Sequence, residues 1–411
     1  MRVLVLSQYF WPENFRVNEL TESLVGRGHA VTVLTGVPNY PEGRVFEDFA
    51  RDPSSFSEYH GARVFRVPML TRGKGALRLV LNYASFAASA SLLGPSRLRG
   101  CEFDVIFVFE TSPVTVGIPS SVLRYLRRTP VVFWVLDQWP ETLEAVGVVR
   151  SKRILGLVGR LVRWIYARCD LVLSQSKGLI PRIQGYCDRP EKVRYFPNWS
   201  DLLPGHDAVE PAAEIPVAPG VFTVLYAGNI GEAQDFPAVL QAADLLANNP
   251  RIRWVIVGSG RMADWVTEEI ARRGLQERIV MAGRFPPERM ASIYPHADAL
   301  LVCLRRDPLF AMTVPGKLQT YLGVGLPVVG MLDGEGGAII REAGAGFACA
   351  AGDSAGLADA VRKLASMAPE QRSEMGRRAR DYSRREFDRE RLMDRLETLF
   401  VEVVSPRAPR D

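Results

Sequence analysis

Residues 313–328, TVPGKLQTYLGVGLPV, place a lysine where its charge needs a partner. Pro315 is typical of a helix start, and Gly325 with Pro327 is typical of a helix end, so Lys317 falls in the first turn of a predicted helix. A cation there opposes the helix dipole unless an anion binds, and a diphosphate is such an anion. The alternative is that Lys317 extends into solvent, because the dipole penalty is only up to about 1 kcal/mol.

Two glycine-rich turns in the second half of the chain each join a predicted strand to a helix. One contains Gly228, Asn229 and Gly231, and the other contains Gly258 and Ser259. Glycine lets backbone N–H groups approach a phosphate, and the helix N-terminus adds partial positive charge. A tight turn needs the same glycines without any ligand, so both interpretations stay open.

A second cation, Arg284, follows another predicted strand, although it equally fits an ordinary surface arginine. The chain has no Asp-x-Asp pair of the kind that holds a diphosphate-bound Mg²⁺. We therefore expect no metal and no other cofactor. The charge of a diphosphate would be met by Lys317, Arg284 and helix N-termini.

The loop after the first predicted strand, residues 7–19, combines aromatic and polar side chains. Trp11, Glu13, Asn14 and Arg16 suit a carbohydrate or a lipid headgroup, and a packed surface loop is the alternative. No GxGxxG follows this strand, although binding of a nicotinamide dinucleotide requires those glycines. The sequence therefore argues against a dehydrogenase.

Two further loops carry polar residues after predicted strands. Asn39 and Tyr40 lie in PNYPEG, where turn formation alone would explain the composition. Asp137 and Glu141 lie in LDQWPE, with Pro140 suited to the first turn of a helix. Asp137 is placed either to cap that helix, or to bind a sugar hydroxyl and accept a proton from an acceptor.

These residues need two parallel sheets to position them. Short β-branched runs alternate with helical patterns, which predicts an α/β fold of two Rossmann-like, doubly wound units in series. The runs are 3–6, 30–35, 63–67, 104–109, 130–136, 170–174 and 193–196, then 222–226, 253–257, 278–282, 299–303, 327–330 and 346–350. Two facing sheets would place ligands in a cleft beyond the carboxyl ends of their strands.

The composition agrees with a folded, two-domain protein. A length of 411 residues exceeds one core, and the Pro- and Ala-rich residues 201–220 resemble a linker. A net charge of +5 is modest, and we expect no nucleic-acid partner. The five scattered cysteines predict neither disulfides nor zinc, and the short apolar start predicts no signal peptide, so we expect the protein in the cytoplasm.

Residues 78–93 and 152–168 are apolar segments with basic residues, and the second carries Lys152, Arg153 and Arg160. Both segments are too short to span a bilayer. Peripheral contact with anionic lipid at the inner membrane is one interpretation, and a helix that covers the core of a doubly wound domain is the other.

Six motifs, TGVPNYPEG, LDQWPE, FPNWSD, YAGNIGEAQ, IVGSGRM and VPGKLQTYLGVGLPVV, occur in an order that resembles glycosyltransferase family 4. The likeness is to the bacterial branch that builds surface polysaccharides, notably N-acetylfucosaminyltransferases of O-antigen and colanic acid. It runs from Met1 to about residue 404. It implies the GT-B fold, a UDP-sugar donor and retention of the anomeric configuration.

The resemblance also implies a division of the chain and of its site. It implies an acceptor-side domain over 1–200, a linker over 201–220, a donor domain over 221–385 and a helix over 386–404 that returns to the first domain. By this resemblance, the diphosphate would contact Asn229, Gly231, Arg284 and Lys317, and the base would lie near Gly258 and Ser259. The sugar would contact Asp137. Residues 9–16, with Asn39 and Tyr40, would face the acceptor. We add Gly228, Pro315, Gly316 and Thr320 to the donor side and Glu141 to the acceptor side, and assign catalysis to Asp137, Lys317 and Arg284.

One departure concerns a pair of glutamates that most of family 4 carries around the predicted helix. Met312 and Thr320 stand at the corresponding positions here.

The predicted function is a retaining transfer of a sugar, such as an N-acetylated hexosamine or deoxyhexosamine, from a UDP-sugar to a saccharide or lipid-linked saccharide. The alternatives are a sugar-nucleotide 2-epimerase, a natural-product glycosyltransferase and a non-catalytic subunit that activates a partner transferase.

Overall fold

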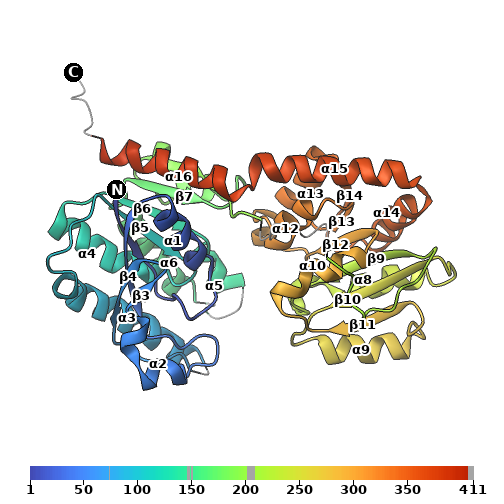
Figure 1. The fold of residues 1–411 in the computed structure, drawn as a ribbon, viewed down its shortest axis with the longest axis horizontal. Coiled ribbons are helices and arrows are strands. Elements are labelled where there is room, and N and C mark those ends of the chain that lie inside the picture. The colour runs from blue at the N-terminus through green and yellow to red at the C-terminus, as the bar shows by residue number, and fades with distance from the viewer. Residues whose placement is uncertain (74, 146–148, 150, 201–208, 406–411) are drawn as a thin grey trace. The chain divides into compact units, whose positions relative to one another are not determined.

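The computed structural model describes residues 1–73, 75–145, 149, 151–200 and 209–405, and the chain forms two compact units (Figure 1). The first unit contains Met1–Phe196 and the chain from Leu392 on, and the second contains Pro197–Arg391. Each unit is an α/β structure built on one sheet of parallel strands. The predicted fold class is therefore confirmed.

The sheet of the first unit has eight strands in the order β3-β4-β2-β1-β5-β6-β7-β8. All neighbours are parallel except β3 and β4. The antiparallel β3 is only two residues long, which is too short to give a pattern in the sequence. The strands are β1 (Arg2–Leu6), β2 (Ala30–Gly36), β3 (Glu58–Tyr59), β4 (Ala62–Val67), β5 (Val105–Glu110), β6 (Val131–Val135), β7 (Leu171–Ser174) and β8 (Val193–Tyr195).

Helices cover this sheet so well that every residue of β5 and β6 is buried. The last helix, α16, adds its own contacts: the ring centroids of Phe400 and Phe107 are 5.8 Å apart, and His29 Nε2 lies 2.7 Å from Glu397 Oε1. The helices are α1 (Arg16–Gly26), α2 (Glu47–Arg51), α3 (Ala76–Arg97), α4 (Gly117–Arg127), α5 (Glu141–Ala145), α6 (Lys152–Tyr166), α7 (Ile180–Gln184) and α16 (Arg389–Val404).

The sheet of the second unit has six parallel strands in the order β11-β10-β9-β12-β13-β14. The strand order reverses between β9 and β12, and loops at such a reversal diverge and leave a crevice for a ligand. The strands are β9 (Phe222–Ala227), β10 (Ile252–Val257), β11 (Ile279–Gly283), β12 (Ala299–Cys303), β13 (Val328–Met331) and β14 (Gly346–Cys349).

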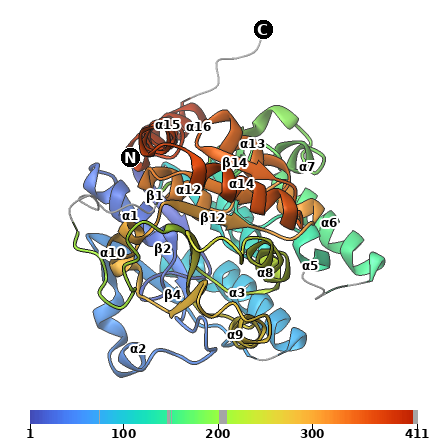
Figure 2. The ribbon, with the colours of Figure 1, turned by 90° about the vertical axis from the view of Figure 1, so that its right-hand side faces the viewer.

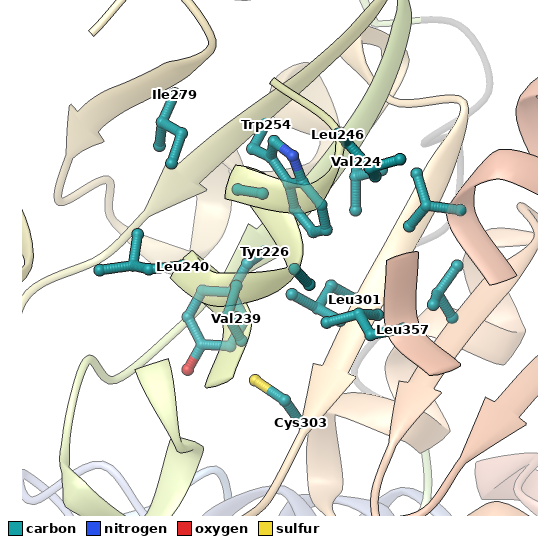
Figure 3. Close-up of a cluster of buried hydrophobic side chains, with 14 of the residues drawn as sticks. Val224, Tyr226, Val239, Leu240, Leu246, Trp254, Ile279, Leu301, Cys303 and Leu357 are labelled. Carbon is teal, nitrogen blue, oxygen red and sulfur yellow. The ribbon is translucent and has the colours of Figure 1, made fainter. Parts of the chain in front are cut away.

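Alternate residues of β9 serve two separate cores, as the twofold repeat of a strand requires. Val224 and Tyr226 pack with α8 and α14, in the cluster that Figure 3 shows, while Leu225 and Ala227 pack on the face covered by α12. Helix α15 packs against α12, and the two lie close together in both views (Figures 1 and 2). The helices are α8 (Phe236–Leu245), α9 (Ala263–Arg272), α10 (Met290–Ile293), α11 (Pro308–Ala311), α12 (Gly316–Val324), α13 (Gly334–Glu342), α14 (Ser354–Ser366) and α15 (Pro369–Glu386).

The predicted linker, residues 201–220, falls partly outside the described residues, which omit 201–208. The remainder lies as a loop against the second unit. Ala212 N–H donates to the carbonyl oxygen of Ser292 at 2.8 Å, and the Ile215 side chain is buried in the core beside α12. This part of the segment therefore packs as part of the second unit.

Helix α12 begins and ends where the sequence predicts. Pro315 is its N-cap residue, and Gly325 ends it in the left-handed conformation with φ +79°.

Among the helices of the described residues, none is both long enough and apolar enough to cross a membrane.

The loops after β9 and β10 cross at two glycines. Gly258 has φ +146°, and a Cβ built there would lie 1.8 Å from the carbonyl oxygen of Gly228. Gly228 has φ +138°, and its Cβ would lie 2.4 Å from Cε of Lys317. A side chain at Gly258 would therefore collide with the backbone of Gly228, and a side chain at Gly228 would collide with the side chain of Lys317.

We predict that Gly258→Ala destabilises the second unit by more than about 3 kcal/mol, because the strained φ and the backbone clash add. Gly274→Ala is the matched control: Gly274 also has a positive φ, +69°, but its Cβ would meet nothing within 4 Å. That variant should lose only about 1 kcal/mol. Urea denaturation of both variants measures the difference, and equal losses would contradict the crossing-loop explanation.

Candidate functional site

A cavity of about 470 Å³ lies at the carboxyl ends of the strands in the second unit. Its lining comes from the ends of β9 and β10, the loops after β9, β10 and β11, the segment around α10, and residues 316–321 of α12. Eight of the predicted donor-side residues line it, namely Gly228, Asn229, Gly258, Ser259, Arg284, Gly316, Lys317 and Thr320. Pro315 and Gly231 are not lining residues.

Lys317 is partly buried at the second position of α12. Its ammonium donates a hydrogen bond to the hydroxyl of Tyr226 and lies 3.8 Å from the centroid of that ring. Burial lowers the pKa of Lys317 to about 8. Among the described residues, no carboxylate pairs with this ammonium, and its charge carries a desolvation cost that a bound anion would offset.

The end of β9 is tied to α12 by a tyrosine that the sequence analysis missed. The fully buried Tyr321 hydroxyl accepts from Ala227 N–H at 2.8 Å and donates to Ala227 O at 3.1 Å. Tyr226 continues the link, because its hydroxyl donates to Asn229 O. Tyr321 lies one helical turn after Lys317, and this spacing is the sequence feature that could have indicated a contact between α12 and the end of β9.

The backbone of the turn after β9 is largely used within the protein. Gly228 N–H donates to Val257 O and Ile230 N–H donates to Ser259 O, both at 2.8 Å. Gly231 N–H donates to Gln234 Oε1 at 3.0 Å. A contact between the Gly231 N–H and a diphosphate would thus have to replace an existing bond, whereas the first N–H groups of α12 have no side-chain cap.

Part of the cavity lining is apolar and aromatic. Phe285, Pro287, Met290 and Tyr294 belong to it, and no sequence pattern marked any of them as a site residue. Phe285 follows Arg284 directly, and the guanidinium of Arg289 covers its ring at 5.1 Å. The cavity therefore combines cationic with apolar and aromatic lining residues.

In the first unit, Glu13 joins two of the predicted acceptor-side loops. One carboxylate oxygen accepts from the N–H groups of Asn39 and Tyr40, both at 2.7 Å, and the other accepts from Phe10 N–H at 3.1 Å. Burial raises the pKa of Glu13. Asn39 is also buried, and its Oδ1 accepts from Arg72 N–H at 2.8 Å.

The aromatic residues of these loops separate into two groups. Tyr40 lies against Tyr9, with ring centroids 5.4 Å apart, while Trp11 packs on Phe56 at 4.7 Å. Asn14 is exposed and Arg16 begins α1. The predicted acceptor-side residues of this unit therefore follow three different strands, β1, β2 and β6, and Trp11 and Tyr40 pack in separate aromatic pairs.

Glu141 is the first residue of α5 and is already paired. Its Oε1 accepts from Arg182 Nη1 and from the Tyr186 hydroxyl, both at 3.1 Å. Asp137, four residues earlier, hydrogen-bonds Ser112, and burial raises its pKa to about 6. The protonation of Asp137 therefore changes near pH 6.

Two family models match this chain. The model for "Glycosyl transferase 4-like domain" matches residues 14–199, and the model for "Glycosyl transferases group 1" matches residues 221–367. The matches cover most of each unit, and the second includes every residue that lines the cavity.

The chain is also similar to curated proteins over most of its length. The putative colanic acid biosynthesis glycosyl transferase WcaI of Escherichia coli K12 is 26% identical over 344 residues, which is 79% of this chain and 82% of that protein. N-acetyl-alpha-D-glucosaminyl L-malate synthase of Bacillus anthracis is 19% identical over 393 residues, which is 94% of this chain and 92% of that protein.

Two solved structures show the same fold at low identity. HepE of Anabaena in complex with UDP has a TM-score of 0.70 at 14% identity, covering 98% of this chain and 100% of that one. WaaG, a glycosyltransferase involved in lipopolysaccharide biosynthesis, has a TM-score of 0.64 at 14% identity, covering 99% and 100%.

We predict that Lys317 makes the stability of the ligand-free protein pH-dependent. Between pH 8 and 10.5 the unfolded chain holds a proton on this lysine that the folded chain has lost, so the free energy of unfolding should rise with pH there, by about 2 to 3 kcal/mol. Lys317→Met should lack this rise and be at least as stable as wild type at pH 7. Urea denaturation across this pH range measures the free energy of unfolding. Lys363→Met, on the exposed face of α14, is the control. Parallel stability curves for wild type and Lys317→Met would contradict the prediction.

Proposed function

This chain belongs to the glycosyltransferases of family 4 and has the GT-B fold, and we propose that it transfers a sugar from a UDP-sugar to a saccharide or lipid-linked saccharide. The observation that carries the proposal is the cavity of the second unit. Its lining combines Lys317, Arg284 and the N-terminus of α12 with apolar and aromatic side chains. A nucleoside diphosphate has the complementary parts, an anion and a flat base.

The chemistry that this cavity supports is the departure of UDP. As the bond from the sugar to the diphosphate breaks, negative charge grows on the leaving oxygen. Lys317 is positioned to meet that charge, because Tyr226 and Tyr321 fix it and its helix before any ligand binds. A neighbouring dianion also favours the charged lysine, which raises its pKa above 8 in the complex.

Phe285, Met290 and Tyr294 support a role for the apolar part of the lining in binding the base, beside the predicted Gly258 and Ser259. The solved HepE structures contain UDP, UDP with glucose, and UDP-glucose, which agrees with a uridine donor in this fold. We extend the proposal to retention of the anomeric configuration. Thr320 lines the cavity where most of family 4 has a glutamate, so we assign it the neighbouring donor hydroxyls.

We propose an N-acetylated sugar as the group transferred and a surface polysaccharide as the product. The relatives' names support this, since one refers to colanic acid and another to N-acetylglucosamine. In this proposal residues 1–200 bind the acceptor and residues 221–385 bind the donor. Asp137 receives the acceptor, and the loop of Trp11, Asn14 and Arg16 extends that surface.

We predict that Lys317→Met lowers kcat/KM for transfer by about 10²- to 10³-fold, because a cation aimed at the leaving diphosphate is lost. UDP release from a panel of UDP-sugars, with membrane extract as the source of acceptor, measures the rate. Isothermal titration with UDP should show weaker binding by the same variant.

Lys363→Met removes an exposed lysine from the same unit and should leave kcat/KM unchanged. An unaltered rate in Lys317→Met would refute the assignment of this lysine. Isomerisation of a UDP-N-acetylhexosamine without an acceptor would instead identify an epimerase.

We also propose that the enzyme works in the cytoplasm with α6 resting on the membrane. One side of α6 exposes Ile154, Leu157 and Trp164, with exposed fractions of 50%, 61% and 39%, and Arg153 and Arg160 adjoin that side. An apolar stripe beside arginines suits the surface of an anionic bilayer. In α3, the other predicted segment, one face is buried against the sheet and the opposite face exposes leucines and a valine.

We predict that Ile154→Glu with Leu157→Glu reduces binding to phosphatidylglycerol vesicles by about tenfold or more, because two apolar contacts become charged. Cosedimentation measures binding, and phosphatidylcholine vesicles test the role of lipid charge. Val217→Glu with Leu245→Glu changes two equally exposed apolar residues of the second unit as a control. If the two double variants bind equally, α6 is not the contact surface.

A further inference from the structure

Glu110 is the last residue of β5, and the sequence analysis did not single it out. Its side chain is fully buried. One carboxyl oxygen, Oε2, accepts from Leu136 N–H at 3.2 Å and from Asp137 N–H at 3.1 Å. Glu110 thus holds the backbone of Asp137 directly, at the point where β6 ends.

The other oxygen of Glu110, Oε1, is buried and has no hydrogen-bond partner among the described residues. Burial raises the pKa of Glu110 well above its usual value, and the charge of Asp137 raises it further. A neutral carboxyl costs less in this position than a carboxylate, because Oε2 still accepts the two N–H groups and no charge is buried. The proton is placed on Oε1, which has no acceptor among the described residues.

Asp137 is fixed from its other side by Ser112, which hydrogen-bonds its carboxylate. The Ser112 hydroxyl also accepts from Trp139 Nε1 at 3.3 Å. Ser112 has φ +99°, a strained conformation for a residue with a side chain. Such strain persists where the surrounding structure requires it, and here it aims a hydroxyl at a carboxylate.

Other ionisable groups face this pair from the helices that cover the sheet. Tyr83 of α3 hydrogen-bonds Ser112, and Tyr166 of α6 is buried within reach of the charge of Glu110. Burial raises the pKa of both phenols, so both are neutral at physiological pH. Asp137 therefore loses its proton first, at about pH 6, and Glu110 keeps its own.

We infer that Glu110 is a positioning residue for Asp137: it fixes the backbone of Asp137 and leaves that aspartate as the single carboxylate that accepts a proton from the sugar acceptor. This inference rests on the proposed function. In the transfer, the sugar–diphosphate bond breaks and its electron pair leaves with UDP. The acceptor oxygen bonds to the anomeric carbon, and its proton passes to Asp137.

A double-mutant cycle tests whether Glu110 acts through Asp137. Asp137→Asn should lower kcat by about 10²- to 10⁴-fold, as expected for loss of a general base. Glu110→Ala should lower kcat by about tenfold, with the KM for the donor unchanged, because two backbone bonds to the loop are lost. In the Asp137→Asn background, Glu110→Ala should cause no further loss. Losses that multiply would overturn the inference.

Glu110→Gln is the conservative variant, because its amide oxygen accepts the same two N–H bonds without a carboxyl proton. It should keep kcat within about threefold of wild type and leave the acid limb of the pH profile near pH 6. Loss of activity equal to that of Glu110→Ala, or displacement of the acid limb by a full unit, would mean that Glu110 is charged, which overturns the inference.

Infrared spectroscopy tests the same point without any substrate. At pH 8 the wild-type protein should show the C=O stretch of a protonated carboxyl that is missing in Glu110→Gln and present in Asp137→Asn. Absence of that band from the wild-type minus Glu110→Gln difference spectrum would overturn the inference. If instead no UDP-sugar is turned over while the band is present, the proposed function fails and the protonated Glu110 stands.

Discussion

The hydroxyl of Tyr321 bonds both the N–H and the carbonyl oxygen of Ala227, and this contact fixes α12 against the end of β9. Much of the candidate site depends on it. A shift of α12 would move Lys317 away from Tyr226 and away from the space that Gly228 leaves for it. Because Tyr321 is fully buried, its two bonds are shielded from water and hold the helix firmly.

Three buried or partly buried ionisable residues illustrate different ways of compensating for lost water. The carboxylate of Glu13 accepts three backbone N–H groups, which joins two loops. Glu110 is compensated by two N–H groups and by neutrality. Among the described residues, Lys317 has a hydroxyl and an aromatic ring as its polar partners, and it lines the cavity of the second unit. The incomplete compensation of Lys317 is what makes it a ligand-binding residue in our proposal.

The two units share an architecture but use their strand ends differently. In the second unit, crossing loops and the N-terminus of α12 line a cavity that combines cationic with apolar and aromatic side chains. In the first unit, carboxylates and aromatic rings dominate the loops after β1, β2 and β6, and several of them are used to hold those loops together. A parallel sheet supplies the edge, and loop composition then decides what chemistry the edge supports.

The sequence by itself determined the parallel strands, the doubly wound fold and the bounds of α12, but not the two-residue antiparallel β3. Buried parallel strands are short continuous apolar runs, and Pro315 begins the helix and Gly325 ends it through local backbone preferences. It also identified Lys317, because a lysine in the first turn of a helix can be recognised from the helix sequence alone. Only the tertiary structure decided which residues surround it, since Tyr226 and Phe285 are distant in sequence, and Tyr321, although one turn away on the same helix, looks like an ordinary core position. The same holds for Glu110, which appears as the end of an apolar strand until β6 brings the N–H of Asp137 beside it. Burial and cross-strand contacts set the protonation of these groups, and neither is a property of a single segment.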